Sequence, residues 1–266
     1  MPLADQRKQY ILNRIERDGT VTVTEMAETL NVSEMTIRRD LIELENSGLV
    51  RRVHGGAVSA RGRSFEPPFL LRVMQNANAK RSIGYRASQL VMEGDSIGLD
   101  IGTTTQEMAT FLTNFHNLTI ITPSLRIAYI FLNQSDIRLI LPGGIVRPGE
   151  ASLVGEMSYQ IFQDFYVDKL FLGISNLNAE TGLTEFNMED AQVKKVMMRN
   201  AKQVILLADS SKFNGIAFAR VCDFNQVHKL VTDAMPEGPL LAKLEEAGVE
   251  IILAQGLEPN QPHIDT

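Results

Sequence analysis

The sequence predicts an α/β fold in which a small helical N-terminal part precedes a larger part built on a mostly parallel sheet. Two observations lead to this prediction. The first 58 residues carry apolar side chains at helical spacing and end in a short alternating stretch. From about Lys80, apolar runs of four to six residues alternate with helical segments, as in a parallel sheet covered by helices on both faces.

Composition and charge restrict the class of protein. The chain has 266 residues, with 44% hydrophobic and 22% charged side chains, which are ordinary values for a globular protein. No apolar run reaches the roughly 18 residues of a membrane span, and the first residues lack the apolar core of a signal peptide. The single cysteine, Cys222, fits a reducing compartment. We therefore expect a soluble cytoplasmic protein with no membrane partner.

The net charge of −6 is unevenly distributed. Residues 1–63 hold ten Lys/Arg against nine Asp/Glu, a net of +1, and the remainder holds 16 against 23, a net of −7. The stretch 49–63 contains no acid, one histidine and four arginines, Arg51, Arg52, Arg61 and Arg63. A basic segment on an acidic body is typical of contact with a phosphate backbone, although a short charge run alone is more often solvated surface.

Three helices are predicted before residue 48. They cover residues 6–17, 23–30 and 34–47, with Thr24 and Ser33 as the expected N-caps of the second and third. Their inward-facing apolar residues are Ile11, Leu12, Ile15, Met26, Ala27 and Leu30. The short turn between the last two helices predicts a helix-turn-helix, whose second helix enters the major groove of DNA.

A β-hairpin is expected after Gly48, which ends the third helix in a left-handed conformation. The stretch "LVRRVHGGAV" alternates and then reaches His54-Gly55-Gly56, a turn that closes a hairpin. Three helices followed by a hairpin form a winged helix-turn-helix over residues 1–58. The residues after this unit, 59–79, are expected to form a linker in which Pro67-Pro68 disfavours helix and Phe65, Phe69 and Leu70 dock on a neighbouring domain or subunit.

Two adjacent arginines, Arg38 and Arg39, lie near the start of the predicted recognition helix. On an exposed face they would be paired by DNA phosphates or guanine edges. The alternative is pairing on the same helix with Glu34, Asp40 or Glu43. The helix spacing, the N-cap, the arginine pair and the basic hairpin together favour double-stranded DNA as a partner. The expected DNA-binding residues are Ser33, Glu34, Met35, Thr36, Arg38, Arg39, Arg51, Arg52 and His54.

The larger part, residues 80–256, reads as alternating strands and helices. The expected strands cover 95–102, 118–123, 137–144, 169–175, 203–209, 229–233 and 249–254. The expected helices cover 80–92, 104–113, 124–132, 187–200 and 237–247. The last ten residues, 257–266, are expected to be a disordered tail.

Polar residues follow several of these strands. The turn Asp100 to Thr105 is rich in glycine and hydroxyls and opens a helix, which suits a phosphate as well as an ordinary N-cap turn. Ligands of open parallel sheets bind at the carboxyl ends of the strands. Further strand ends carry Gly, Ser, Thr and Lys, namely at Thr122 to Ser124, Pro142 to Gly144 and Asp209 to Lys212. This chemistry favours a small polar anion such as a sugar phosphate.

These motifs resemble those of the DeoR-type bacterial transcriptional regulators. "TIRRDLIELENSGLVRRVHGGAV" is similar to their DNA-binding domain, and "LDIGTTT", "LPGG", "LVGE", "DKLFLGIS", "GLTEFNMEDAQVKKVMM" and "LLADSSKF" to their effector domain. The resemblance implies a sequence-specific regulator, usually a repressor of a sugar or polyol utilisation operon, that acts on the bacterial nucleoid. It also implies a sensor domain related in fold to ribose-phosphate isomerases and glucosamine-phosphate deaminases, which binds a phosphorylated sugar or polyol.

The resemblance further implies which residues bind the effector. They are Asp100, Gly102, Thr103, Thr104, Thr105, Ser124, Gly143, Gly144, Glu185, Lys194 and Lys212. Lys212 would be the main cation for the phosphate, and Glu185 or Asp100 would accept the sugar hydroxyls. The sequence departs from the family pattern at Pro123, where asparagine is usual, and at Ala79-Lys80, which replaces an acid–lysine pair.

An isomerase-like enzyme is the main alternative class. Asp100, Asp209 and Glu185 offer a carboxylate base, but the Gly-rich lysine loop of the isomerases is absent. We therefore expect no enzymatic activity and no cofactor, and the scattered histidines indicate no metal. Because one short helix reads too few bases, we expect a homodimer or homotetramer. Whether the effector weakens or tightens DNA binding stays open.

Overall fold

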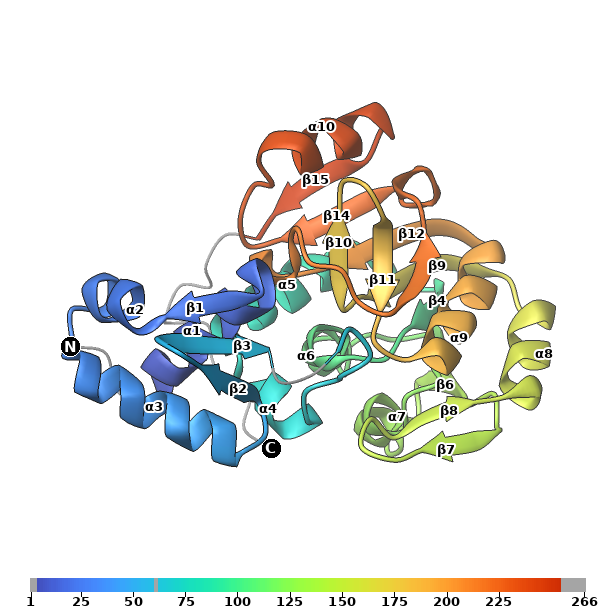
Figure 1. The fold of residues 1–266 in the computed structure, drawn as a ribbon. Coiled ribbons are helices and arrows are strands. Elements are labelled where there is room, and N and C mark those ends of the chain that lie inside the picture. The colour runs from blue at the N-terminus through green and yellow to red at the C-terminus, as the bar shows by residue number, and fades with distance from the viewer. Residues whose placement is uncertain (1–3, 60–61, 255–266) are drawn as a thin grey trace.

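The computed structural model describes residues 4–59 and 62–254, so the predicted tail and Arg61 lie outside the described residues. Figure 1 shows a small N-terminal unit, coloured blue, beside a larger α/β unit. The small unit has its own apolar core, which includes Ile11, Met26, Ile37 and Leu41. Among the described residues, no helix has the length and apolar character needed to cross a membrane.

The N-terminal unit has the predicted three helices and hairpin. Its elements are α1 (Ala4–Asp18), β1 (Thr20–Thr22), α2 (Val23–Leu30), α3 (Glu34–Asn46), β2 (Val50–Val53) and β3 (Gly56–Ser59). Ser33 caps α3 as predicted, and Gly48 has the predicted left-handed backbone, with φ of 65°. The predicted N-cap Thr24 is wrong. Helix α2 begins at Val23, the first residue of the predicted range, so the Thr22 hydroxyl caps it by accepting from the Glu25 N–H, and Thr24 lies inside the helix.

A third strand, which the sequence pattern did not predict, completes the wing. Strand β1 pairs antiparallel with β3, and the sheet has the order β1-β3-β2. A Cβ on Gly56 would lie 2.0 Å from the Val21 carbonyl oxygen, so only glycine allows these two strands to approach. The hairpin is therefore attached to the helical core along its length.

The larger unit is a seven-stranded sheet with the order β15-β14-β12-β9-β4-β5-β6. Every pairing within this sheet is parallel, which confirms the predicted fold class. Its strands are β4 (Ser96–Leu99), β5 (Leu118–Ile121), β6 (Ile137–Ile140), β9 (Val167–Gly173), β12 (Ala201–Leu207), β14 (Lys229–Thr232) and β15 (Glu250–Leu253). All seven coincide with predicted strands to within a few residues.

Helices cover both faces of this sheet. One apolar core takes side chains from α5 (Ala77–Ser88), α6 (Thr103–Thr110) and α7 (Leu125–Phe131). The second takes side chains from α8 (Glu156–Asp164), α9 (Met188–Arg199) and α10 (Gly238–Glu246). Because each face is buried, the strands read as continuous apolar runs, which is the reason that the sequence revealed them.

Two short antiparallel insertions were not predicted. A three-stranded sheet is formed by β10 (Asn176–Asn178), β11 (Gly182–Glu185) and β13 (Ala219–Cys222), and a hairpin is formed by β7 (Ile145–Arg147) and β8 (Ser152–Val154). These short strands mix polar and apolar residues and lack the continuous apolar runs of the parallel sheet. Cys222 lies in the first insertion, where burial raises its pKa to about 12, so the buried thiol stays protonated and unreactive at neutral pH.

The predicted linker contains a helix. Helix α4 (Phe69–Met74) begins directly after Pro68, and α5 begins at Ala77, three residues before the expected start. Phe69 is buried, and two guanidinium groups lie over its ring, with the Cζ of Arg126 at 3.9 Å and the Cζ of Arg72 at 5.4 Å from the ring centre. Leu70, in contrast, is exposed. The linker thus packs on the larger unit through Phe69.

Candidate DNA-binding surface and effector pocket

The first turn of α3 is fixed by its cap. The Ser33 hydroxyl accepts a hydrogen bond from the Thr36 N–H at 3.2 Å, which satisfies one of the donors left open at the helix start. Met35 lies on this turn with 61% of its surface exposed. An exposed methionine and a half-buried threonine at the start of a helix present apolar and hydroxyl groups in the position from which a recognition helix reads base edges.

The alternative pairing of the two arginines holds for only one of them. Arg38 forms an exposed ion pair with Glu34 at 3.2 Å. Arg39 is exposed and makes no ion pair with any residue of the described chain. The other two candidate acids are engaged elsewhere, because Asp40 pairs with Arg7 and Glu43 with Lys8, both on α1. Arg39 is therefore available to an external anion.

The Arg7–Asp40 pair fixes the recognition helix on the core. The guanidinium donates to both carboxylate oxygens, at 2.7 and 2.9 Å, and both side chains are buried. A buried bidentate pair defines one orientation of α3 relative to α1.

The wing carries three exposed basic residues. Arg51 and Arg52 lie on β2, and His54 lies in the turn to β3, where Gly55 has φ of 83°. Arg52 contacts Glu45 of α3 at 3.6 Å, and its N–H donates to the same carboxylate at 2.9 Å. Arg51 has no ion pair within residues 4–59 and 62–254. The structure thus places Arg39 and Arg51 as two unneutralised cations of one small unit.

A polar cavity lies at the carboxyl ends of β4, β9 and β12, where the sequence predicts a ligand. Its volume is about 40 Å³. Residues Gly102 to Thr104 form one wall at the N-terminus of α6, and Lys212 lies on the 3₁₀ turn that follows strand β12. The remaining lining residues are Glu66, Arg72, Ile101, Glu150, Gly173, Ile174, Ser175, Glu185, Phe186, Lys194, Leu207 and Ala208.

A buried charge cluster forms the floor of this cavity. Lys194 contacts Asp100 and, at 3.3 Å, Glu185, and it is 1% exposed. Asp100 also accepts the Gly173 N–H at 3.0 Å. Burial raises the pKa of Asp100 to about 6 against the opposing effect of Lys194. Burial would lower the pKa of Lys194, but Asp100 and Glu185 more than offset it and raise that pKa, so the ammonium stays charged.

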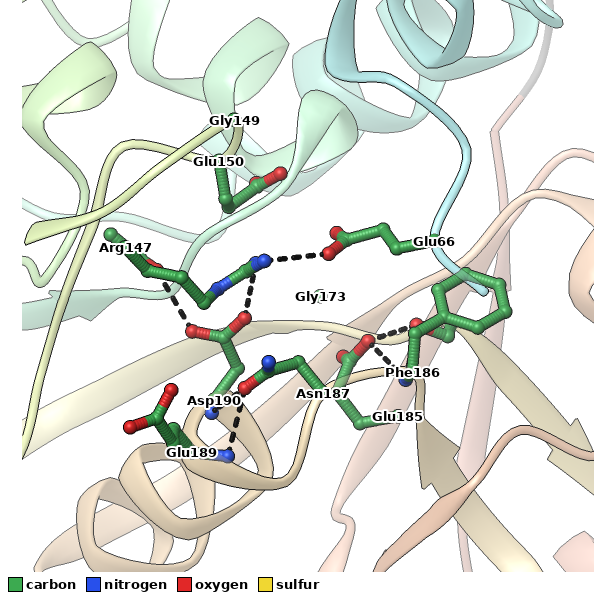
Figure 2. Close-up of polar contacts among 12 residues, drawn as sticks. Glu66, Arg147, Gly149, Glu150, Gly173, Glu185, Phe186, Asn187, Glu189 and Asp190 are labelled. Carbon is green, nitrogen blue, oxygen red and sulfur yellow. Dashed lines mark hydrogen bonds and ion pairs between the residues drawn. The ribbon is translucent and has the colours of Figure 1, made fainter. Parts of the chain in front are cut away.

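Glu185 is oriented by the chain around it. Its carboxylate accepts hydrogen bonds from the Ser175 hydroxyl and, at 2.9 Å, from the Phe186 N–H, as Figure 2 shows. A carboxylate fixed in this way is an acceptor for the hydroxyls of a polar ligand.

The structure brings together six of the eleven predicted effector residues. Gly102, Thr103, Thr104, Glu185, Lys194 and Lys212 line the cavity. The other five do not. Asp100 is covered by Lys194, and the Thr105 hydroxyl donates to the Gly102 carbonyl at 2.9 Å. Ser124 caps α7, and Gly143 and Gly144 pack against Ser158.

Sequence reasoning missed three charged lining residues. Glu66 and Arg72 belong to the linker, and Glu150 lies in the turn of the β7–β8 hairpin. Burial raises the pKa of Glu150 to about 7, with Arg72 opposing.

The sequence marks Lys80 only as a departure from the family pattern. It is buried, its ammonium donates to the Arg72 carbonyl, and burial, then Lys212, lowers its pKa to about 8. No local periodicity marks these residues.

A winged helix-turn-helix joined to an α/β unit with a polar cavity defines a DNA-binding regulator that has a small-molecule pocket. The chain matches the DeoR-like helix-turn-helix domain over residues 7–62 and the DeoR C terminal sensor domain over residues 75–234. The chain belongs to the DeoR family of transcriptional regulators.

Relatives span nearly the whole chain. The HTH-type transcriptional repressor CsqR of Escherichia coli is 32% identical over 94% of this chain and 95% of its own length. The HTH-type transcriptional regulator GlpR of Haloferax volcanii is 34% identical over 94% and 98%. The glycerol-3-phosphate regulon repressor of Escherichia coli is 31% identical over 93% and 98%. These relatives are regulators, which supports regulation over catalysis as the activity of this chain.

Solved structures give a weaker likeness. Ribose 5-phosphate isomerase A of Methanocaldococcus jannaschii has a TM-score of 0.39 and 21% identity, over 52% of this chain and 55% of its own. At this level the likeness carries no inference about activity.

Proposed function

We propose that the chain represses a sugar or polyol utilisation operon, and that a phosphorylated sugar or polyol bound in the cavity releases it from operator DNA. One observation carries the effector half of this proposal. The hydroxyl-rich N-terminus of α6 and the Lys212 cation lie on the walls of one cavity, and a phosphate needs both N–H donors and a cation. The name of one relative, a glycerol-3-phosphate regulon repressor, supports the same class of ligand.

The DNA-binding half rests on the residues of α3 and the wing. Met35, Thr36 and Arg39 are proposed to contact base edges, and Ser33, Glu34, Arg38, Arg51, Arg52 and His54 to complete the contact surface. A single α3 reads few base pairs, so two or four copies are proposed to bind paired half-sites. The proposed location is the bacterial cytoplasm, at the nucleoid when operator DNA is bound.

A thermal-shift panel tests the effector proposal. The purified chain is screened against sugar and polyol phosphates, with the unphosphorylated parents as controls. A ligand at about 100 times its Kd stabilises the folded state by about 2.7 kcal/mol, which is readily measured. A shift with a phosphorylated compound and not with its parent identifies the effector class. The absence of any shift across the panel would contradict the proposal.

Lys212→Ala is expected to remove the response to the phosphorylated compound found in this panel. Lys212 is a cation of the cavity that makes no ion pair within residues 4–59 and 62–254, so its loss removes a charge-assisted hydrogen bond and weakens binding about tenfold or more. Titration calorimetry measures the change. Operator affinity is expected to stay normal, because Lys212 lies outside the winged helix. An unchanged effector affinity would mean that the phosphate binds elsewhere.

Arg51→Ala is expected to change the salt dependence of DNA binding. Each lost phosphate contact lowers the slope of log K against log salt by about 0.9 for B-DNA. Fluorescence anisotropy on an operator selected from random DNA measures the slope, and Arg138→Ala, an exposed arginine on β6, is the control. A slope equal to that of the unmodified protein would remove Arg51 from the contact surface.

A further inference from the structure

Four charged residues connect the linker to the sensor unit, and we name them the linker clamp: Glu66 and Arg72 of the linker, and Arg147 and Glu150 of the β7–β8 hairpin. Arg72 contacts Glu150 and lies 3.0 Å from Glu66. Arg147 contacts Glu66 at 2.8 Å, as Figure 2 shows. The four side chains are between 2% and 18% exposed, so the clamp is a largely buried network.

The clamp forms one wall of the effector cavity. Glu66, Arg72 and Glu150 line the same space as Thr103, Thr104 and Lys212. Its volume of about 40 Å³ is far below the roughly 300 Å³ at which ligand pockets begin. A sugar phosphate therefore fits only after a wall has moved.

The strand-end wall is held by backbone contacts. A Cβ on Gly173 would lie 2.6 Å from the Ile101 carbonyl oxygen, so the backbone at the end of β9 is in close contact with the segment after β4. These strands are also joined by parallel ladder bonds. The linker wall, in contrast, is held by side-chain ion pairs and by Phe69.

The charge balance of the clamp determines how it opens. Arg147 also contacts Asp190 of α9, so three carboxylates share two guanidinium groups. An incoming phosphate meets Glu66 and Glu150 on the cavity wall and is repelled until one of them withdraws. A withdrawing Glu150 leaves Arg72 with one carboxylate partner, Glu66, in place of two.

We propose that Arg72 is an effector-binding residue contributed by the linker, and that an anionic group of the effector replaces the Glu150 carboxylate on its guanidinium. This inference rests on the proposed function and adds a residue to its pocket. It also links effector binding to a movement of helix α4, because Arg72 belongs to that helix. Helix α4 and the residues after it share a groove with α1, lined by Leu71, Met74 and Gln75 on one side and Tyr10 and Asn13 on the other.

From α1, the route continues to DNA through a contact already described. Arg7 of α1 holds Asp40 of α3 by a buried bidentate pair. A displacement of α4 by the effector thus reaches the recognition helix through packed and ion-paired elements. An effector can shift a protein between two conformations only if it binds one of them more tightly. In this proposal the two conformations differ in the partner of Arg72, which is Glu150 in one and the anionic group of the effector in the other.

Two substitutions of the same ion pair distinguish binding from a structural role. In the full chain, Glu150→Gln keeps the shape of the side chain and removes one of the two carboxylates that contact Arg72, so the affinity for inorganic phosphate is expected to rise about tenfold. Arg72→Gln removes the anion partner, and that affinity is expected to fall about tenfold. Titration calorimetry measures both, with Arg138→Gln as the matched control and circular dichroism as the test of folding.

Hydrogen exchange gives the second readout. Phosphate is expected to protect the backbone at 102–106 and to accelerate exchange at 66–76 in the unmodified chain, and Glu150→Gln is expected to accelerate exchange at 66–76 without phosphate. A fall in phosphate affinity in both variants would overturn the proposal, because a merely structural pair weakens the site from either side. Normal phosphate affinities in both variants would also overturn the proposal if Lys212→Ala still abolishes binding. In that case the phosphate binds in the pocket, and only the role of Arg72 is wrong. No protection at 102–106 would overturn the pocket and this inference together.

Discussion

Lys194→Met is expected to lower the free energy of unfolding by about 3–5 kcal/mol, the usual cost of removing one partner from a buried ion pair. Lys194 is 1% exposed and is the shared partner of Asp100 and Glu185. Without it, two carboxylates face each other inside the sensor unit with no cation to offset their burial. Denaturant unfolding measures the loss. Lys195→Met, the next residue of the same helix, is the control and is expected to change stability far less.

This loss is expected to depend on pH in a defined direction. The pKa of Asp100 is already about 6 in the folded protein, above its ordinary value of 3.8, because burial disfavours the charged form. Lys194 lowers that pKa, so it rises further in the variant. A raised carboxyl pKa means that the folded state takes up a proton as the pH falls, and the deficit shrinks from pH 7 towards about pH 5. A deficit equal at both pH values would rule out buried charge as its cause.

Arg39→Ala is expected to abolish specific operator binding at concentrations where the unmodified chain binds. A bidentate arginine–guanine contact contributes about 1–3 kcal/mol of discrimination, or roughly 5- to 150-fold in affinity. Arg39 is exposed and has no ion pair among the residues that the structure describes, so its removal costs the fold little. Anisotropy titrations with the selected operator and with a scrambled duplex measure the ratio of affinities.

The control for this experiment is Arg199→Ala, an exposed arginine in the last turn of α9. The control is expected to keep the operator affinity of the unmodified chain. Phosphate binding is expected to be normal in both variants, since neither residue lines the cavity. If Arg39→Ala retained both affinity and specificity, α3 would not be the recognition helix.

The sequence predicts the elements whose burial requires a run or a helical repeat of apolar residues. All seven strands of the parallel sheet are visible, because both faces are covered and each strand is a continuous apolar run. The Ser33 cap is visible because a hydroxyl precedes a clear helix. Helix α2 has two threonines, Thr22 and Thr24, near its start, and either could be the N-cap. Which of them caps the helix depends on where β1 ends. That position is set by pairing with β3, about 35 residues later in the chain.

The cavity was predictable only in the part that the sheet builds. Thr103, Thr104 and Lys212 follow strands directly, so strand ends locate them. Glu66 reaches the same space from the linker, and Glu150 reaches it from a hairpin turn. Glu150 and its partner Arg72 are more than 70 residues apart in the chain. Local sequence carries no signal for such a contact. Ser124, Gly143 and Gly144 illustrate the opposite case, since they also follow strands but serve helix capping and close packing.

Because of the buried Arg7–Asp40 pair, the orientation of the recognition helix and its DNA contacts depend on different residues. The orientation of α3 is set by Asp40 and by core residues such as Ile37 and Leu41, whereas Met35, Thr36 and Arg39 are exposed or half-exposed on its first turns. Residues of the second set can be exchanged without disturbing the first. The operator preference of α3 can therefore change while its packing stays the same. Replacing residues 35, 36 and 39 by the corresponding side chains of a relative is a direct way to direct this sensor to another promoter.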